Sequence, residues 1–195
     1  PITEFKQQEP VEGAEPTEAS EIRILIDGVA LYIGAMFFDD PDGVLAYQKR
    51  RDKGLGTDDR FMWILDTFLD GRTGYFFEIN PSGAMGDAQL LPGSGGNFGT
   101  TQNRAWDGIW NARVRHSEIG WTIEIEIPFR TLNFDSDAPA WGINFQRTIR
   151  RKNEENLWTG HERNQGLRRM SNAGLLLGIS DVTQGRGLDV KPYVT

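Results

Sequence analysis

Residues 21–38 read EIRILIDGVALYIGAMFF, two apolar runs separated by Asp27-Gly28. In the first run, isoleucines recur at every second position, as Ile22, Ile24 and Ile26. A period of two places these side chains on one face of an extended strand. Because Asp-Gly between two such runs is typical of a tight two-residue turn, the stretch predicts a β-hairpin.

The same period continues along the chain. In GWTIEIEIP, residues 120–128, apolar side chains alternate with Thr122, Glu124 and Glu126. Residues 61–68 are apolar on both faces, which is typical of a central strand. Further strands are expected at residues 73–79, 109–114, 141–149, 157–159, 174–179 and 188–194. Since no segment of ten residues keeps a helical period, we expect an all-β fold, an antiparallel β-sandwich of jelly-roll or immunoglobulin-like topology.

The chain divides into three parts by composition. Residues 1–20 are acidic and rich in proline, and we expect an extended N-terminal arm. Residues 21–186 are expected to form the β-sandwich domain, and residues 187–195 the start of a connection to a downstream domain. Within the domain, residues 80–106 are rich in glycine and show no period, so they are expected to form a long loop.

Composition excludes several function classes. The 21 Lys and Arg against 28 Asp and Glu give a net charge of −7, which argues against a nucleic-acid partner. The absence of cysteine rules out disulfides, thiolate metal sites and cysteine nucleophiles. Apolar runs are too short to span a bilayer, so no membrane-spanning segment is expected.

Two acidic residues are candidates for a catalytic pair. Glu124 and Glu126 share one strand face, with Cβ atoms about 7 Å apart at a rise of roughly 3.3–3.4 Å per residue. This spacing is near that of glycosidase carboxylates. The alternative, which we favour, is the solvent face of an amphipathic strand. The chain is therefore expected not to be an enzyme.

Acidic clusters suggest a metal. Carboxylates at strand ends and in loops can bind calcium, and the expected ligands of a structural Ca2+ are Asp39, Asp40, Asp58 and Asp59. The alternative is that these aspartates form turns, since Asp accepts hydrogen bonds from its own backbone. No other cofactor is expected.

An arginine-rich segment stands out in this acidic chain. Arg147 shares a strand face with Ile143, Phe145 and Ile149, which predicts a buried and paired guanidinium. The remaining arginines of residues 150–169 either contact an anionic partner or pair with the acidic loops, and we favour internal pairing.

Several segments together resemble family 9 carbohydrate-binding modules. They are EIRILID (21–27), ALYIGAMFF (30–38), GTDDRFMWILD (56–66), GWTIEIEIP (120–128), WGINF (141–145) and SNAGLLLG (171–178). The phrases RRD (50–52), DTFLD (66–70), GYFFEINP (74–81) and RTIRRKNE (147–154) resemble a version at the N-terminus of large bacterial surface proteins, where the domain leads into an outer-membrane β-barrel.

The resemblance implies a sandwich that holds a glycan end between two aromatic rings. Trp158 corresponds to one ring, and Leu55-Gly56 occupies the place of the other. An acidic and a basic residue of the family correspond to Met62 and Glu78. Of the other tryptophans, Trp63, Trp121 and Trp141 are expected in the core. The candidate carbohydrate-binding residues are Trp158, Trp106 and Trp110, with Asn103, Asp107, Arg163 and Asn164 as the polar rim.

The function that follows is non-catalytic binding of a carbohydrate or glycan by a bacterial cell-envelope protein, periplasmic or at the cell surface and associated with the outer membrane. Such a module would serve carbohydrate metabolism. The alternative is a protein-interaction or plug-like domain that docks on its own downstream outer-membrane barrel without binding sugar.

Overall fold

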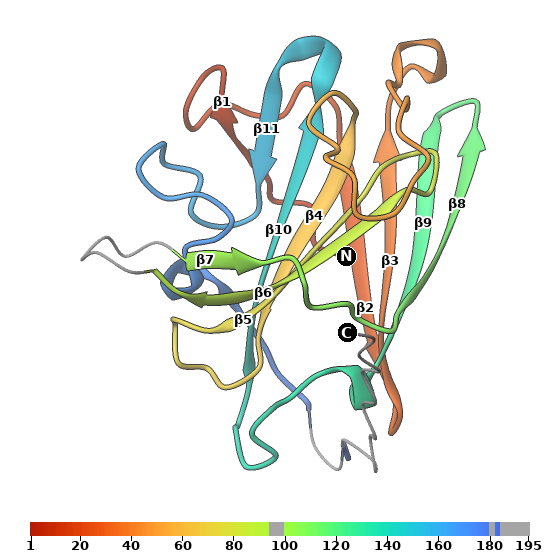
Figure 1. Ribbon diagram of the computed structural model, residues 1–195. Helices are drawn as coiled ribbons and strands as arrows, with labels where there is room; N and C mark the ends of the chain where they lie inside the picture. The colour runs from red at the N-terminus through yellow and green to blue at the C-terminus, as the bar shows by residue number, and fades with distance from the viewer. Residues whose placement is uncertain (94–99, 180–181, 184–195) are drawn as a thin grey trace, which may run out of the picture.

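The protein is a sandwich of two antiparallel sheets (Figure 1). The computed structural model describes residues 1–93, 100–179 and 182–183. The smaller sheet has the order β2 (Ser20–Ile26), β3 (Ala30–Phe38), β9 (Gly120–Pro128) and β8 (Asn111–Ser117). The larger has the order β1 (Lys6–Glu9), β11 (Glu154–Leu157), β10 (Trp141–Ile149), β4 (Arg60–Asp66), β5 (Gly74–Ile79), β6 (Met85–Pro92) and β7 (Thr100–Asn103), and β12 (Gly174–Leu176) also pairs with β10. Helical structure in the described residues consists of short 3-10 turns at Pro41–Gly43, Phe129–Thr131, Arg150–Lys152 and Met170–Asn172.

The predicted hairpin is confirmed as β2 and β3. The Asp27 carboxylate accepts the backbone N–H groups of Val29 and Ala30 at 2.8 and 2.9 Å, which fixes the turn. These bonds lower the pKa of Asp27. The returning strand β3 then pairs with β9 over its whole length, with Leu31 opposite Ile127, so two predicted amphipathic strands lie side by side.

Part of the N-terminal arm is an extended strand of the larger sheet, whereas the chain turns back at residues 10–13, where Gln7 N donates to Ala14 O at 2.9 Å. Its strand β1 pairs with β11, and Phe5 is buried. Farther along the arm, Thr17 donates from its N–H and hydroxyl to Glu154 at 3.0 and 2.7 Å. The predicted connection at residues 187–195, with the strand expected at 188–194, lies outside the described residues.

The prediction of one long loop over residues 80–106 was wrong in part. Met85–Pro92 and Thr100–Asn103 form paired strands, β6 and β7, beside β5. Gly86 interrupts the period of two that would have predicted a strand here. It lies opposite Glu78, and a Cβ at this position would be 3.1 Å from the Glu78 side chain. Residues 94–99 lie outside the described residues.

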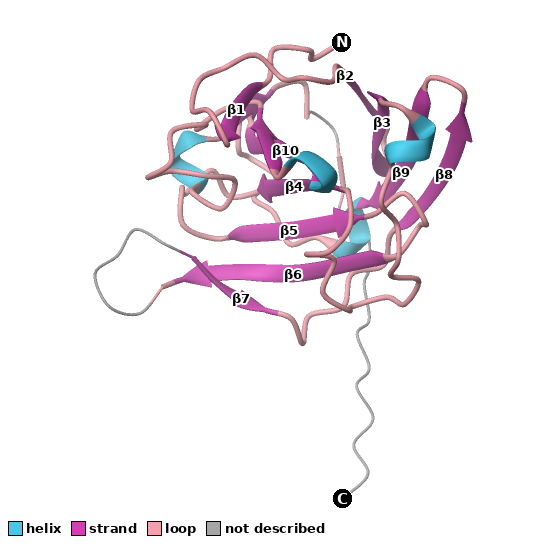
Figure 2. Ribbon diagram, turned by 90° about the horizontal axis from the view of Figure 1, so that it is seen from above, coloured by secondary structure: helices cyan, strands magenta, loops and turns pink. Residues whose placement is uncertain are grey.

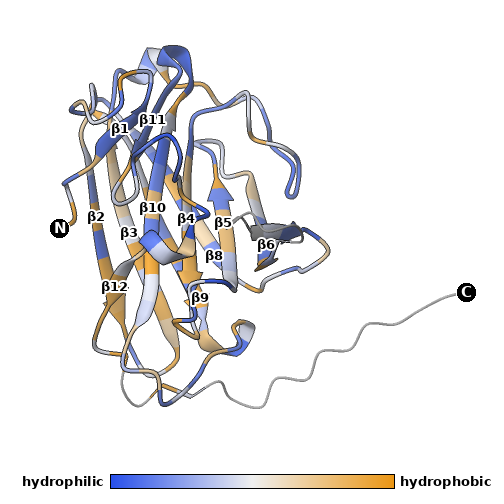
Figure 3. Cartoon of the chain, turned by 90° about the vertical axis from the view of Figure 1, so that its left-hand side faces the viewer, coloured by the Kyte–Doolittle hydropathy of each residue, from blue (hydrophilic) through white to orange (hydrophobic). Residues whose placement is uncertain are grey.

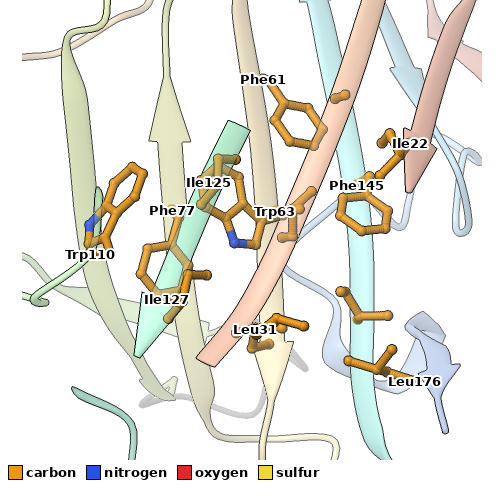
Figure 4. Close-up of a cluster of buried hydrophobic side chains, with 14 of the residues drawn as sticks. Ile22, Leu31, Phe61, Trp63, Phe77, Trp110, Ile125, Ile127, Phe145 and Leu176 are labelled. Carbon is orange, nitrogen blue, oxygen red and sulfur yellow. The ribbon is translucent and has the colours of Figure 1, made fainter. Parts of the chain in front are cut away.

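The core lies between the two sheets. Seen from above, β4, β5 and β6 cross on one side of it and β3, β9 and β8 on the other (Figure 2). Aromatic rings from both sheets meet there, with Phe37 of β3 and Phe61 of β4 having centroids 5.0 Å apart. Trp63 lies beside Phe77 in the centre (Figure 4). Trp63, Trp121 and Trp141 are all buried, as predicted.

Arg147 is also confirmed as a buried, paired residue, since it is 1% exposed. Its guanidinium extends from β10 across to the smaller sheet. There it donates to Phe38 O at 2.9 Å and to the Asp39 carboxylate at 2.7 Å. The side chain therefore joins the two sheets at one end of the sandwich.

The outer face of the larger sheet has a second, smaller apolar cluster. Leu167 and Met170, from the segment after β11, pack against Met62, Ile64 and neighbouring residues of this face. Figure 3 views this side, where β10 carries both hydrophilic and hydrophobic stretches. The segment covers only part of the face, and the part beside it forms the site described below. No helix in the described residues has the length and apolarity to cross a bilayer.

Candidate functional site

A cavity of about 350 Å³ lies on the outer face of the larger sheet. The alternation of the strands explains its lining, because the residues next to the inward-facing rings point outward. Its apolar side chains are Met62, Phe76 and Leu167. Its polar side chains come from β1, β4, β5, β7, β10, β11 and two loops: Gln8, Arg60, Glu78, Gln102, Arg104, Gln146, Glu155 and Arg168.

Strand register aligns these side chains in rows. Met62 on β4 lies opposite Glu78 on β5 and opposite Gln146 on β10. In the next row Thr148 of β10 lies opposite both Arg60 and Glu155. Directly opposed residues of an antiparallel pair share a face. Side chains far apart in sequence therefore meet on one surface.

Glu78 is the centre of the polar network. This carboxylate is 1% exposed and lies between two arginines. Arg60 Nη1 is 3.3 Å from its Oε2, and Arg104 Nη1 is 3.2 Å from its Oε1. Gly86 leaves the space that the Glu78 side chain occupies on the way to Arg104. A buried carboxylate needs such partners, because unpaired burial of a charge is very costly.

Three further hydrogen bonds orient the side chains that line the cavity. Gln146 donates from Nε2 to Glu155 Oε2 at 3.0 Å, and Arg104 donates from Nε to Gln102 Oε1 at 3.2 Å. On the far side, Gln8 donates to the carbonyl of Glu162 at 2.8 Å. The polar groups are thus oriented before any ligand arrives, and preorganisation lowers the cost of binding.

The three candidate tryptophans lie against the interior of the sandwich. Trp110 is 3% exposed, and its indole donates to the Asp87 carboxylate at 2.9 Å. Burial raises the pKa of Asp87, against the lowering effect of that indole bond. Trp106 is half-buried and packs on Tyr75, with centroids 4.7 Å apart.

Trp158 follows β11 and is also half-buried on the inner side. Its ring is 5.9 Å from that of Phe145, at 45°, and it covers Gly174 so closely that a Cβ there would lie 2.4 Å from the indole. Trp158 therefore packs at the edge of the core, where β11 ends and β12 begins.

The predicted polar rim is split between opposite edges of the larger sheet. Asn103 is the last residue of β7, and Asp107, which follows the strand, accepts from Arg51 at 3.0 Å. Arg163 lies beside the N-terminal arm, with its Nε 2.9 Å from Glu9, and the exposed Asn164 follows it. Neither these four residues nor the three tryptophans line the cavity, so the structure does not bring the predicted platform together.

The residues that do line the cavity were missed, although the sequence carried a signal for them. Glu78 directly follows Phe77, and Gln146 directly follows Phe145. A polar residue next to a core ring on a strand points to the opposite face. That period of two would have placed both side chains on the outer face.

The predicted calcium ligands are engaged elsewhere. Asp39 is paired with Arg147 and Arg151, and Asp58 accepts from Gln48 N and Asn80 Nδ2. Asp59 accepts from Arg150 N, and Asp40 caps the turn Pro41–Gly43. Across the described ranges, no group of three or more acidic or histidine side chains is placed to hold a metal ion. Calcium stays a prediction without a described set of ligands.

Glu124 and Glu126 lie on the outer face of the smaller sheet, as expected of a solvent face. They line an open groove of about 570 Å³ with Tyr32, Asn111 and Arg113. Glu124 is exposed, and Glu126 accepts from Asn111 Nδ2 at 3.2 Å. The groove lacks the buried charges that distinguish the cavity on the larger sheet.

Comparison with known proteins identifies the fold. No family model matches the sequence, and no curated protein matches it. A family 9 carbohydrate-binding module from Caldicellulosiruptor kristjanssonii, solved with cellotriose, is 13% identical with a TM-score of 0.62, covering 97% of this chain and 88% of that chain. The structure of such a module from the same organism with glucose is 14% identical with a TM-score of 0.60 and the same coverage.

A further solved structure, described as a putative carbohydrate-binding protein from Bacteroides uniformis, is 15% identical with a TM-score of 0.58. It covers 80% of this chain, and 77% of that chain is matched. At such identities the likeness concerns the arrangement of strands, which agrees with the two sheets described above. The chain therefore has the β-sandwich fold of family 9 carbohydrate-binding modules.

Proposed function

We propose that this protein is a non-catalytic carbohydrate-binding module and that the cavity on the outer face of the larger sheet holds the sugar. The observation that carries the proposal is the buried Glu78 between Arg60 and Arg104, beside the apolar surface of Met62 and Phe76. Sugar hydroxyls both donate and accept, so they need donors and acceptors side by side. Their C–H faces need an apolar surface.

Size and fold support the same proposal. A volume of about 350 Å³ falls at the lower end of the range of small-molecule sites, about 300–1,000 Å³, and suits one or two sugar rings. The modules of similar fold were solved with cellotriose and with glucose. Glucose and short β-glucans are therefore the first neutral ligands to test.

We propose binding without catalysis because both carboxylates in the cavity already have hydrogen-bond partners. Glu78 is held by two arginines, and Glu155 accepts from Gln146. Glycoside hydrolysis needs one carboxyl to deliver a proton and a second to act as nucleophile or base. Release of reducing ends that is lost in Glu124→Gln would contradict this part of the proposal.

Calorimetric titration of the 195-residue chain with a panel of mono- and oligosaccharides tests the binding. Arg104→Gln should weaken binding about tenfold or more, since a hydrogen bond to a charged group contributes about 1.5–3 kcal/mol. Arg115→Gln, an exposed arginine on the other sheet, is the matched control. Trp158→Phe tests the sequence-predicted platform in the same assay, and loss of binding there but not in Arg104→Gln would move the site to Trp158.

We also propose, on the sequence motifs alone, that the module works in the periplasm or at the bacterial cell surface. Fractionation of cells expressing the full-length protein tests this, and recovery in the cytoplasm would contradict it.

The docking alternative drew on the arginine-rich segment. Three of these side chains, Arg147, Arg151 and Arg163, are paired within the chain.

A further inference from the structure

The cavity carries an excess of positive charge in an acidic protein. Arg60, Arg104 and Arg168 line it against two glutamates, Glu78 and Glu155. The lining therefore has one more cationic than anionic side chain, whereas the whole chain has a formal net charge of −7. A neutral sugar does not require this local reversal of charge, because its hydroxyls can be bound by amides and paired ions alone.

The two best-defined arginines have donors to spare. Arg60 contacts Glu78 through Nη1 alone, and Arg104 contacts it through Nη1 while using Nε on Gln102. Each contact to the carboxylate is a single long bond rather than the two-point pairing that a guanidinium can make. Both side chains remain partly accessible, at 23% for Arg60 and 46% for Arg104.

Arg60 also has one buried donor without an acceptor. Its Nε is buried and has no hydrogen-bond partner among the described residues. A buried N–H without an acceptor costs about 1–3 kcal/mol. The same burial closes this atom to a ligand, so an anion would act on Arg60 through the accessible part of its side chain, where it would offset the local positive charge.

We infer that the ligand of this site is a sugar bearing a carboxylate, of the uronic-acid type; the inference rests on the proposed function. A uronate presents two coplanar oxygens at the edge of a sugar ring, which match the planar fork of a guanidinium. Arg60 and Arg104 bind the carboxylate. The Gln146–Glu155 pair, on the adjoining strands, binds the hydroxyls.

Three ligands that differ only at C6 test the inference: methyl β-D-glucuronoside, its methyl ester and methyl β-D-glucoside, each with its galacto counterpart. Calorimetry on the intact chain should show the uronate binding at least about tenfold more tightly than its ester. The difference should shrink as NaCl rises from about 50 mM to about 500 mM, since salt screens accessible charges. Arg104→Lys keeps the charge but loses the fork, and should lose most of the preference.

The outcomes separate the two proposals. Equal affinity for uronate, ester and glucoside overturns the inference and leaves carbohydrate binding standing. Binding of none of the six ligands, together with no signal from the neutral oligosaccharides, overturns both. A preference for the uronate that persists unchanged in Arg104→Lys and in Arg60→Lys also overturns the inference, because the carboxylate is then bound elsewhere. Circular dichroism confirms that each variant is folded.

Discussion

Arg147→Met removes a buried cation that joins the two sheets, and its effect on stability can be worked from the contacts. The guanidinium faces five oxygen atoms: Glu18 O, Ala19 O, Ser20 Oγ, Phe38 O and Asp39 Oδ2, at 2.7 to 3.4 Å. Methionine matches the Arg147 side chain as far as Nε and lacks Cζ and the two Nη atoms that contact these oxygens. The cost therefore comes from oxygens that lose their donor while remaining buried.

The size of that cost follows from the carboxylate. Removing one partner of a buried ion pair typically costs about 3–5 kcal/mol. Asp39 keeps a second partner, since Arg151 Nη2 lies 2.6 Å from its other oxygen, so we expect the lower half of that range. For a chain of this size each kcal/mol lowers the melting temperature by about 2–4 °C. Arg147→Met should therefore melt roughly 6–16 °C below the wild type.

Urea denaturation followed by tryptophan fluorescence measures the free energy of unfolding directly. Arg130→Met, at an exposed arginine, is the control and should change stability by no more than about 0.5 kcal/mol. Arg147→Lys should be intermediate, because an ammonium has three donors for five oxygens. A urea midpoint for Arg147→Met equal to that of the wild type would refute the reasoning. The cost of desolvating the guanidinium would then cancel the stabilisation from its hydrogen bonds.

Two further changes test other parts of the fold. Gly174→Ala puts a methyl group 2.4 Å from the Trp158 indole, so the free energy of unfolding should fall by about 1–3 kcal/mol. The tryptophan fluorescence should shift to the red as the ring moves into water. An unshifted spectrum would contradict this packing. Burial raises the pKa of Asp87 above its usual 3.8, so the folded state holds this proton more tightly and the contribution of Asp87 to stability falls as pH rises through its folded pKa. Urea midpoints on both sides of pH 3.8 should show this fall in the wild type, and a fall of the same size in Asp87→Asn would exclude Asp87 as its source.

The fold was largely accessible from the sequence because its signals are local. The turn at Asp27-Gly28 and the alternation in residues 120–128 report on neighbouring residues only. Even Arg147 was predictable, since its place among Ile143, Phe145 and Ile149 put it on a buried face. The β6–β7 pair was missed, since Gly86 breaks the period in order to make room for Glu78.

The sequence by itself determined the alternation of side chains, and with it two layered sheets around an aromatic core. Tertiary structure alone decided which polar residues share a surface. Arg60, Glu78 and Arg104 come from three segments and meet through strand register, and Trp158 turns inward because Gly174, on a separate strand, leaves space for its ring. Alternation along a strand determines the face on which each side chain lies, whereas pairing between strands distant in sequence determines which side chains lie next to it. A binding site depends on those neighbours.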